Sequence, residues 1–115
     1  MINAWLNAFK AAWIAKDIDQ VLSLFADDVE YWETPHKKLD GKAALSHEWN
    51  AILGQKDIAL ELRVFSSSDG NAHSVLWELS YEDEKSRIQN WAGTYLIELN
   101  AAGKCVYFHQ TGEKK

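Results

Sequence analysis

Cysteine and proline are nearly absent from this sequence, which contains one residue of each. Because a single cysteine, Cys105, cannot form an intrachain disulfide, a disulfide-stapled secreted scaffold is excluded and a reducing cytoplasm is the expected location. The sequence has no run of about eighteen apolar residues, and its first residues lack the basic, apolar and small-residue order of a targeting signal. We therefore expect neither a membrane anchor nor a leader.

Basic residues are also too few to suggest a polyanionic partner. Twelve Lys and Arg residues stand against seventeen Asp and Glu residues, a net charge of −5, and the sequence pI is about 5.3. Nucleic acids and anionic membranes are bound through basic surfaces, so neither is expected as a partner.

Aromatic residues are abundant, in contrast. The 115 residues include six Trp, four Tyr and four Phe, within a hydrophobic fraction of 47% and a charged fraction of 25%. This length and composition predict one globular domain over residues 1–115. So many rigid rings suggest either a bulky core or an apolar pocket whose walls keep their shape.

The first half of the sequence is predicted to be largely helical. Apolar residues recur at steps of three and four from Ile2 to Ala15, as in an amphipathic helix. Asp17 is a typical N-cap for a second short helix, which we expect to end at Asp27-Asp28. Asp40-Gly41 opens a third helix that closes near Gly54. The buried stripe of the second helix is expected to comprise Val21, Leu22, Leu24 and Phe25.

Strand patterns alternate with turns along the rest of the chain. A short strand over Val29–Glu33 leads into a loop with Pro35, and apolar alternation then marks residues 58–65, 75–81, 91–97 and 105–110. Turns are expected at 66–71, around Asp69-Gly70, and at 82–85 and 100–104, with a frayed tail at Gly112–Lys115. This order predicts an α+β fold with three N-terminal helices packed on one face of a strongly curved, mostly antiparallel sheet.

Four short segments carry a family resemblance. They are Ala15-Lys16-Asp17-Ile18-Asp19, Leu24-Phe25-Ala26-Asp27-Asp28-Val29, Asp40-Gly41-Lys42-Ala43-Ala44-Leu45 and Ala102-Gly103-Lys104. In this order and spacing the chain resembles the nuclear-transport-factor-2-like superfamily and, within it, the SnoaL-like and ketosteroid-isomerase-like branch. The resemblance implies a cystatin-like cone around an internal apolar pocket. Members of the branch include isomerases, cyclases, epoxide hydrolases and non-catalytic binders, so the fold alone does not define a function.

Glu33 is the strongest candidate for a catalytic group. It lies at the end of the first predicted strand, within Tyr31-Trp32-Glu33-Thr34-Pro35, and the isomerases of this branch carry their carboxylate base at a similar strand ending. A carboxylate enclosed by aromatic rings is poorly hydrated, so its pKa rises and it can transfer protons near neutral pH. The alternative is a solvated glutamate at the end of a strand.

The resemblance also implies hydrogen-bond donors that stabilise an enolate oxygen. Phe9 stands where the family has a tyrosine donor, and Tyr95 stands near the position of its protonated acid. Tyr95 can donate a hydrogen bond but Phe9 cannot, and the loss of one such donor typically lowers a rate by about a hundred- to a thousandfold. We therefore expect proton transfer with Glu33 as base and Tyr95 as donor, rather than ketosteroid isomerase activity itself.

The expected ligand is a small apolar or aromatic molecule that carries a carbonyl or hydroxyl group. Its predicted contacts are Phe9, Trp13, Tyr31, Trp49, Trp77, Tyr81, Trp91, Phe108 and Gln110. Indole N–H groups are fixed donors for such an oxygen. The alternative is that the rings fill the cone, because aromatic residues pack cores as readily as they line pockets.

No metal or cofactor is expected. His36, His47, His73 and His109 lack the spacing of paired metal ligands, and no glycine-rich phosphate loop occurs. His36 adjoins the proline loop, either at the mouth of the pocket or exposed to solvent, and His109 is expected to face away from Phe108 and Gln110.

A non-catalytic dimeric module is the alternative function. Phe65, Leu76 and Leu96 fall on the strand positions that face outward, away from the helices. An exposed sheet face with this apolar content predicts a homodimer formed through the outer side of the sheet.

Overall fold

The chain folds into helices and strands largely where its apolar patterns predict them. The computed structural model describes residues 1–68 and 70–115. Its elements are α1 (Ile2–Ile14), α2 (Ile18–Ser23), β1 (Phe25–Thr34), β2 (Lys37–Leu39), α3 (Gly41–Trp49), the 3-10 helix η1 (Asn50–Gly54), β3 (Lys56–Ser67), β4 (Ala72–Glu82), β5 (Ile88–Leu99) and β6 (Cys105–Lys114). Asp69, in the predicted 66–71 turn, lies outside the described residues.

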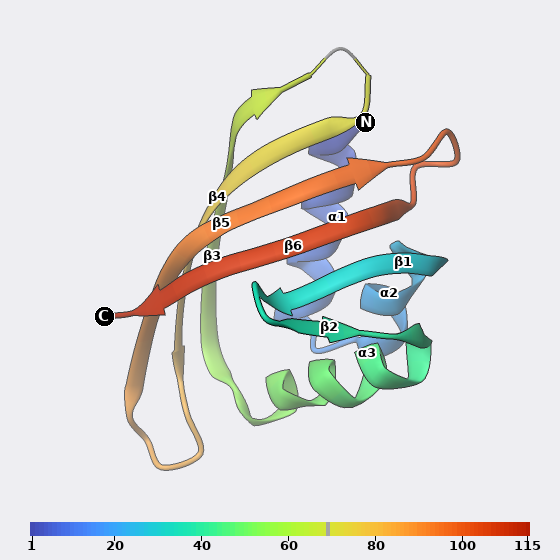
Figure 1. The fold of residues 1–115 in the computed structure, drawn as a ribbon. Coiled ribbons are helices and arrows are strands. Elements are labelled where there is room, and N and C mark those ends of the chain that lie inside the picture. Colours follow the sequence, from blue (N-terminus) through green and yellow to red (C-terminus); the bar gives the residue numbers. More distant parts are fainter. Residues whose placement is uncertain (69) are drawn as a thin grey trace.

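The strands form a six-stranded sheet in the order β2-β1-β6-β5-β4-β3. All neighbours are antiparallel except β1 and β6, which run parallel, so the predicted α+β class and mostly antiparallel sheet are confirmed. The pairing register of β3 with β4 shifts between Val64 and Ser66, and irregularities of this kind bend a sheet. The long strands curve around α1, which lies against their concave face (Figure 1).

Helix α1 supplies one wall of the core. Its buried stripe is Trp5, Leu6, Phe9, Ala12 and Trp13. Phe9 is fully buried, with its ring stacked on Trp5 at 5.0 Å and set edge-on against Trp13 and Tyr95. Fully burying a large apolar side chain stabilises a fold by roughly 1.5–3 kcal/mol, so this stripe anchors the helix to the sheet.

The second helix is shorter than its sequence suggests. Asp17 caps it as predicted, accepting a hydrogen bond from the backbone N–H of Gln20 at 3.1 Å. The expectation that it ends at Asp27-Asp28 is wrong, because the helix stops at Ser23 and β1 begins at Phe25. The backbone N–H of Cys105 donates to the Leu24 carbonyl at 2.9 Å. Pairing with β6 therefore draws this segment into the sheet, against its local helical pattern.

The chain end was also predicted incorrectly. Residues 112–114 are not frayed but belong to β6, where Lys114 pairs with Trp91. The short strand β2 was not predicted, because only its last residue, Leu39, is buried. The partner of the chain end, Trp91, is distant in sequence, whereas β2 pairs with the neighbouring β1 but has only three residues, so neither place carries a strong local pattern.

Two glycines are required where β5 and β6 pair next to Trp77. Gly93 of β5 and Gly112 of β6 are register partners. A side chain at Gly112 would meet the indole ring of Trp77, and one at Gly93 would meet the backbone carbonyl of Thr111. These two residues therefore let β6 approach β5 and Trp77 closely at the rim of the pocket.

Candidate active site

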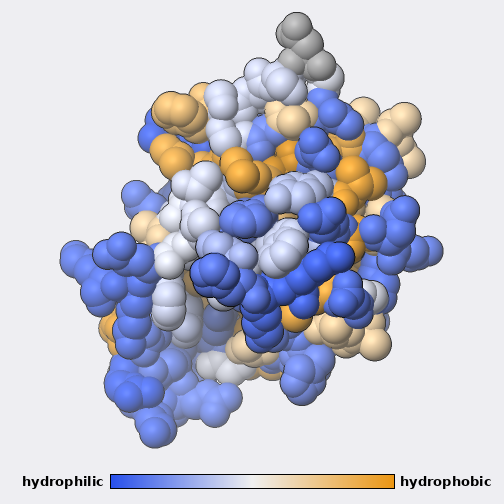
Figure 2. Space-filling model, in the orientation of Figure 1, coloured by the Kyte–Doolittle hydropathy of each residue, from blue (hydrophilic) through white to orange (hydrophobic). Residues whose placement is uncertain are grey.

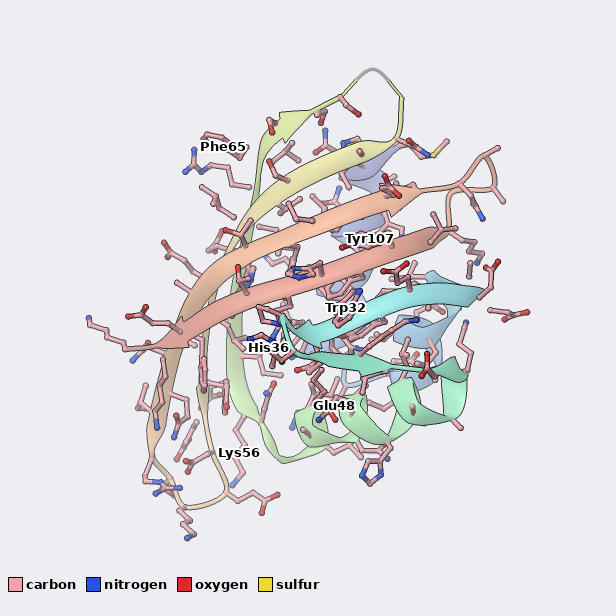
Figure 3. The ribbon with its side chains drawn as sticks, viewed as in Figure 1. Trp32, His36, Glu48, Lys56, Phe65 and Tyr107 are labelled. Carbon is pink, nitrogen blue, oxygen red and sulfur yellow. The ribbon has the colours of Figure 1, made fainter. Side chains whose placement is uncertain are left out.

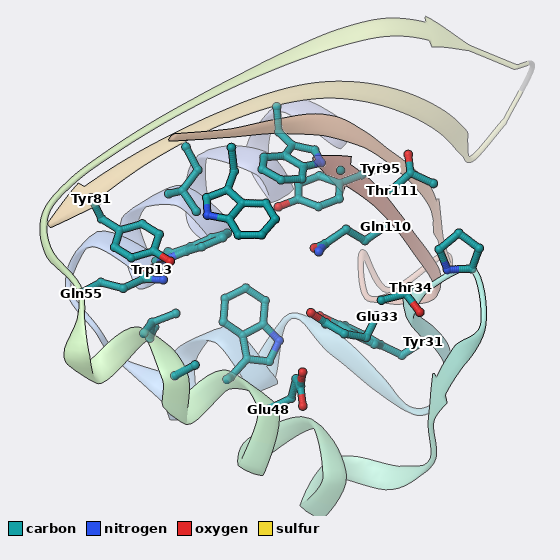
Figure 4. Close-up of a pocket in the computed structure, with 18 residues that line it drawn as sticks. Trp13, Tyr31, Glu33, Thr34, Glu48, Gln55, Tyr81, Tyr95, Gln110 and Thr111 are labelled. Carbon is teal, nitrogen blue, oxygen red and sulfur yellow. Dashed lines mark hydrogen bonds between the residues drawn. The ribbon is translucent and has the colours of Figure 1, made fainter. Parts of the chain in front are cut away.

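A cavity of about 360 Å³ lies between the concave face of the sheet and the α3–η1 segment. Its lining residues come from α1, β1, α3, η1, β4, β5 and β6, and Figure 4 draws them around the central space. They are Trp13, Tyr31, Glu33, Thr34, Pro35, Glu48, Trp49, Ala51, Ile52, Gln55, Trp77, Leu79, Tyr81, Trp91, Tyr95, Gln110, Thr111 and Gly112. The cone is thus hollow at one end rather than filled by its tryptophans.

Glu33 lies at the wall of this cavity, near the end of β1, and is half-buried. Burial raises the pKa of its carboxyl from 4.5 to about 7, and the negative charge of Glu48 adds to the rise. Lys37 and the Tyr31 hydroxyl act in the opposite direction. Near neutral pH both protonation states of Glu33 are therefore populated, as a residue that takes up and returns a proton requires.

Two buried phenols accompany this carboxyl. Burial raises the pKa of both Tyr31 and Tyr95 well above the usual tyrosine value, and the charge of Glu33 adds to each rise. Both hydroxyls are therefore neutral donors at physiological pH. Phe108 fixes their rings, because Tyr31 and Tyr95 each lie 4.8 Å from it between ring centroids.

Three indole rings form part of the lining. Trp77 stacks on Tyr95 at 5.4 Å, and Trp49 meets Trp13 edge-on at 5.0 Å, so packing holds these rings. The Nε1 atoms of Trp49, Trp77 and Trp91 are buried and have no hydrogen-bond partner among the described residues. The indoles therefore present apolar ring surface to the pocket.

The structure brings together most of the residues that the sequence assigns to the site. Glu33 and Tyr95 line the cavity, together with Trp13, Tyr31, Trp49, Trp77, Tyr81, Trp91 and Gln110. Phe9 and Phe108, also expected as ligand contacts, are not among the lining residues: both are fully buried in the core behind the pocket wall. Their rings lie 6.2 Å apart and support the residues in front of them.

Several lining residues were not predicted. Glu48 faces the cavity from α3 and pairs with Lys37 at 3.3 Å, and Gln55 follows η1 and accepts a hydrogen bond from the Trp13 indole at 2.8 Å. Glu48 could have been found from its position beside Trp49 on the third helix. Gln55 sits between a helix end and a strand start, where no periodic pattern marks it. His36, one possible mouth residue, is exposed and outside the lining.

Among residues 1–68 and 70–115, no cluster of three or more His, Cys, Asp or Glu side chains could hold a metal ion. Within the same residues, none of the helices has the length and apolar character needed to cross a bilayer.

A curved sheet around one long helix, with a pocket at its open end, is the NTF2-like cone. Sequence comparison identifies the family of this chain within that fold class. The chain belongs to the family of the SnoaL-like domain, whose model matches residues 6–108. No curated protein matches the sequence.

Solved structures share this fold at low sequence identity. The epoxide hydrolase/cyclase-like enzyme SalBIII of salinomycin pyran ring formation is 14% identical, with a TM-score of 0.83 over 96% of this chain and 89% of that chain. A Δ5-3-ketosteroid isomerase from Mycobacterium sp. is 16% identical, with a TM-score of 0.81 over 97% and 96%. RV0760c from Mycobacterium tuberculosis, solved with estradiol-17beta-hemisuccinate, is 18% identical, with a TM-score of 0.79 over 93% and 89%.

Proposed function

We propose that this protein binds a small apolar or aromatic carbonyl compound and moves a proton on it, with Glu33 as the base. The observation that carries the proposal is the Glu33 carboxyl, whose pKa rises to about 7 in an aromatic pocket. Similar structures include RV0760c with estradiol-17beta-hemisuccinate and a designed 17-OHP binder, which supports a ligand built of fused rings.

The proton transfer follows from the donors around Glu33. The carboxylate takes a proton from the carbon next to the ligand carbonyl, and the C–H electron pair moves to form an enolate. Tyr95 donates a hydrogen bond to the oxygen that gains charge. The protonated Glu33 then returns the proton to the same or a conjugated carbon, which exchanges or isomerises the ligand. Tyr31 of β1 adds a second phenol to the site. It supplies a donor that Phe9 cannot supply, because Phe9 stands where the family resemblance implies a tyrosine.

Hydrogen exchange on a model ketone tests this chemistry directly. We expect the protein to accelerate exchange of the α-protons of 2-tetralone in D₂O, followed by NMR. Because the carboxylate is the active form, the rate should rise with pH through a midpoint near 7. Glu33→Gln should abolish the acceleration, and Tyr95→Phe should reduce it by about a hundredfold.

The matched control is Glu61→Gln, which removes the same charge from an exposed position on β3. It should leave the exchange rate unchanged. An exchange rate equal to that of buffer, or one that Glu33→Gln does not alter, would contradict the proposed catalysis.

Binding without catalysis is the second candidate function. It is favoured by the aromatic rings that line the pocket, which bind a ring compound but move no proton. In that case ring ketones would raise the melting temperature while the exchange of their α-protons stays at the buffer rate.

We also propose a homodimer through the convex face of the sheet. Phe65 is 69% exposed and Leu96 is 45% exposed. Leu76 of the central strand β4 pairs with Arg63 of β3 and Thr94 of β5, each two residues along the strand from Phe65 and Leu96. Figure 3 labels Phe65 and Tyr107 on this side, and Figure 2 shows hydrophobic and hydrophilic residues interspersed over it. Sedimentation should show a dimer at micromolar concentration, and Phe65→Lys should shift it to a monomer. A wild-type monomer would contradict the proposal.

A cytoplasmic location is proposed on the chemistry of Cys105. Its thiol is fully buried and unpaired, which suits a reducing compartment. Cell fractionation tests this placement, and recovery of the protein outside the cytoplasm would contradict it.

A further inference from the structure

The end of the pocket remote from Glu33 carries a polar group with a fixed orientation. The indole N–H of Trp13 donates to the Oε1 atom of Gln55 at 2.8 Å, and this bond is buried. An indole nitrogen has no acceptor capacity, so the oxygen of the amide must face Trp13. The Nε2 group of Gln55 is thereby turned away from Trp13 as a double donor.

The Nε2 group of Gln55 is accessible from the pocket, because it is not among the buried polar atoms that lack a partner. Gln55 is only 8% exposed and lines the pocket. None of the hydrogen bonds formed among residues 1–68 and 70–115 engages its Nε2 atom, whereas the other buried glutamine, Gln89, donates to Asp83 at 2.9 Å. An acceptor oxygen of a ligand in the pocket can therefore bind this donor.

The two polar ends of the pocket lie apart. Figure 4 shows Gln55 and Tyr81 together near Trp13, while Glu33 and Tyr31 lie toward the opposite end with Gln110 facing them across the space. Trp77, Leu79 and Trp91 also line the pocket, from β4 and β5, and the Nε1 atoms of the two indoles are enclosed by protein. The far end therefore offers the Gln55 donor, and Glu33 supplies the carboxyl at the near end.

We propose that the pocket selects planar ligands with two oxygen functions at opposite ends, and that Gln55 binds the oxygen remote from Glu33. Trp13 acts as a positioning residue, because it fixes which atom of the amide faces the ligand. The inference rests on the proposed function in assuming that the pocket takes a ring compound. It adds a requirement for a second oxygen that the proton-transfer chemistry does not demand.

A pair of small probes isolates the second oxygen. Naphthalene-2,6-diol and 2-naphthol share one ring system and differ by one hydroxyl at the far end of the molecule. Isothermal titration calorimetry should show that the diol binds about tenfold more tightly, as expected for one additional buried hydrogen bond. Gln55→Met, which keeps the side-chain shape but removes the donor, should make the two probes bind equally.

Two further variants keep the test decisive. Trp13→Phe should lower the preference for the diol, because the amide is then free to turn, and this ratio is independent of a general loss of affinity. Gln89→Met changes the other buried glutamine in the same way outside the pocket lining and should leave the tenfold preference intact.

The possible failures are distinguishable. If neither probe binds, the inference is overturned, while the proposed function is judged separately by the exchange of 2-tetralone. If wild type binds both probes equally, or Gln55→Met weakens both by the same factor, the pocket takes a ring compound without reading its second oxygen and the inference is overturned. The relative affinity of wild type for the two probes is measured without any variant. It therefore still tests the proposal if the Gln55→Met protein does not fold.

Discussion

Substitution of Glu33 by Gln should stabilise the protein at alkaline pH while removing its chemistry. The folded state holds the carboxyl proton more tightly than the unfolded chain, because burial raises the pKa from 4.5 to about 7. Wild type therefore loses stability as the pH rises from about 4.5 to about 7, and the loss is complete above that window. Gln at this position carries no charge at any pH and shows no such loss.

The size of the effect follows from the pKa change. A rise of this size corresponds to about 3 kcal/mol, and the partial solvent access of Glu33 reduces the expectation to about 2–3 kcal/mol. The free energies of unfolding of wild type and Glu33→Gln should therefore be similar near pH 4. The variant should be more stable by about 2–3 kcal/mol near pH 8.

Urea denaturation at the two pH values and one protein concentration measures this difference. Glu61→Gln again controls for the loss of one negative charge. If the difference between wild type and Glu33→Gln is the same at both pH values, the carboxyl is well hydrated in the folded state and the assignment of Glu33 as a base loses its physical basis.

Three other predictions follow from neighbouring contacts. Lys37→Met should raise the pKa of Glu33 above about 7 and Glu48→Gln should lower it, as read from the carboxyl carbon by NMR; shifts in the same direction would contradict the electrostatics. Gly112→Ala should place a methyl group against the Trp77 indole and lower the free energy of unfolding by about 1–3 kcal/mol, as measured by urea denaturation. An unchanged denaturation midpoint would show that the pocket wall accommodates the methyl group. Burial raises the pKa of the Cys105 thiol to about 12, so a thiol reagent should label it only on unfolding; rapid labelling of native protein would refute this.

Much of the fold was accessible from the sequence because its elements bury continuous stripes. The period of three and four in α1, and the alternation in β3 to β5, each place one apolar face toward the same core. The errors at Phe25 and at the chain end fall where pairing is remote. Phe25 enters β1 rather than α2 because β6, 80 residues later at Cys105, pairs with it.

The candidate site was only partly predictable for a related reason. The many large aromatic residues indicate a pocket, and Glu33 stands out as a carboxylate among aromatic residues in the sequence. Which rings line the cavity depends on how deeply each ring is buried. Phe9 of α1 packs against Tyr95 of the sheet and does not reach the cavity, whereas Trp13 of the same helix lines it. Gln55 acquires its orientation from an indole 42 residues away in sequence, which no local pattern records.

The parallel pairing of β1 with β6 sets an order on biosynthesis. The first strand to leave the ribosome finds its inner neighbour only when the last strand has been made, so the cone cannot close around its hollow during most of translation. Until then the nascent chain exposes part of the apolar face of its sheet, and the β1–β2 hairpin lacks its partner strand β6. Such an intermediate is prone to aggregation. A polypeptide arrested after Leu99 would lack the wall that carries Gln110, and we expect it to depend on chaperones for solubility.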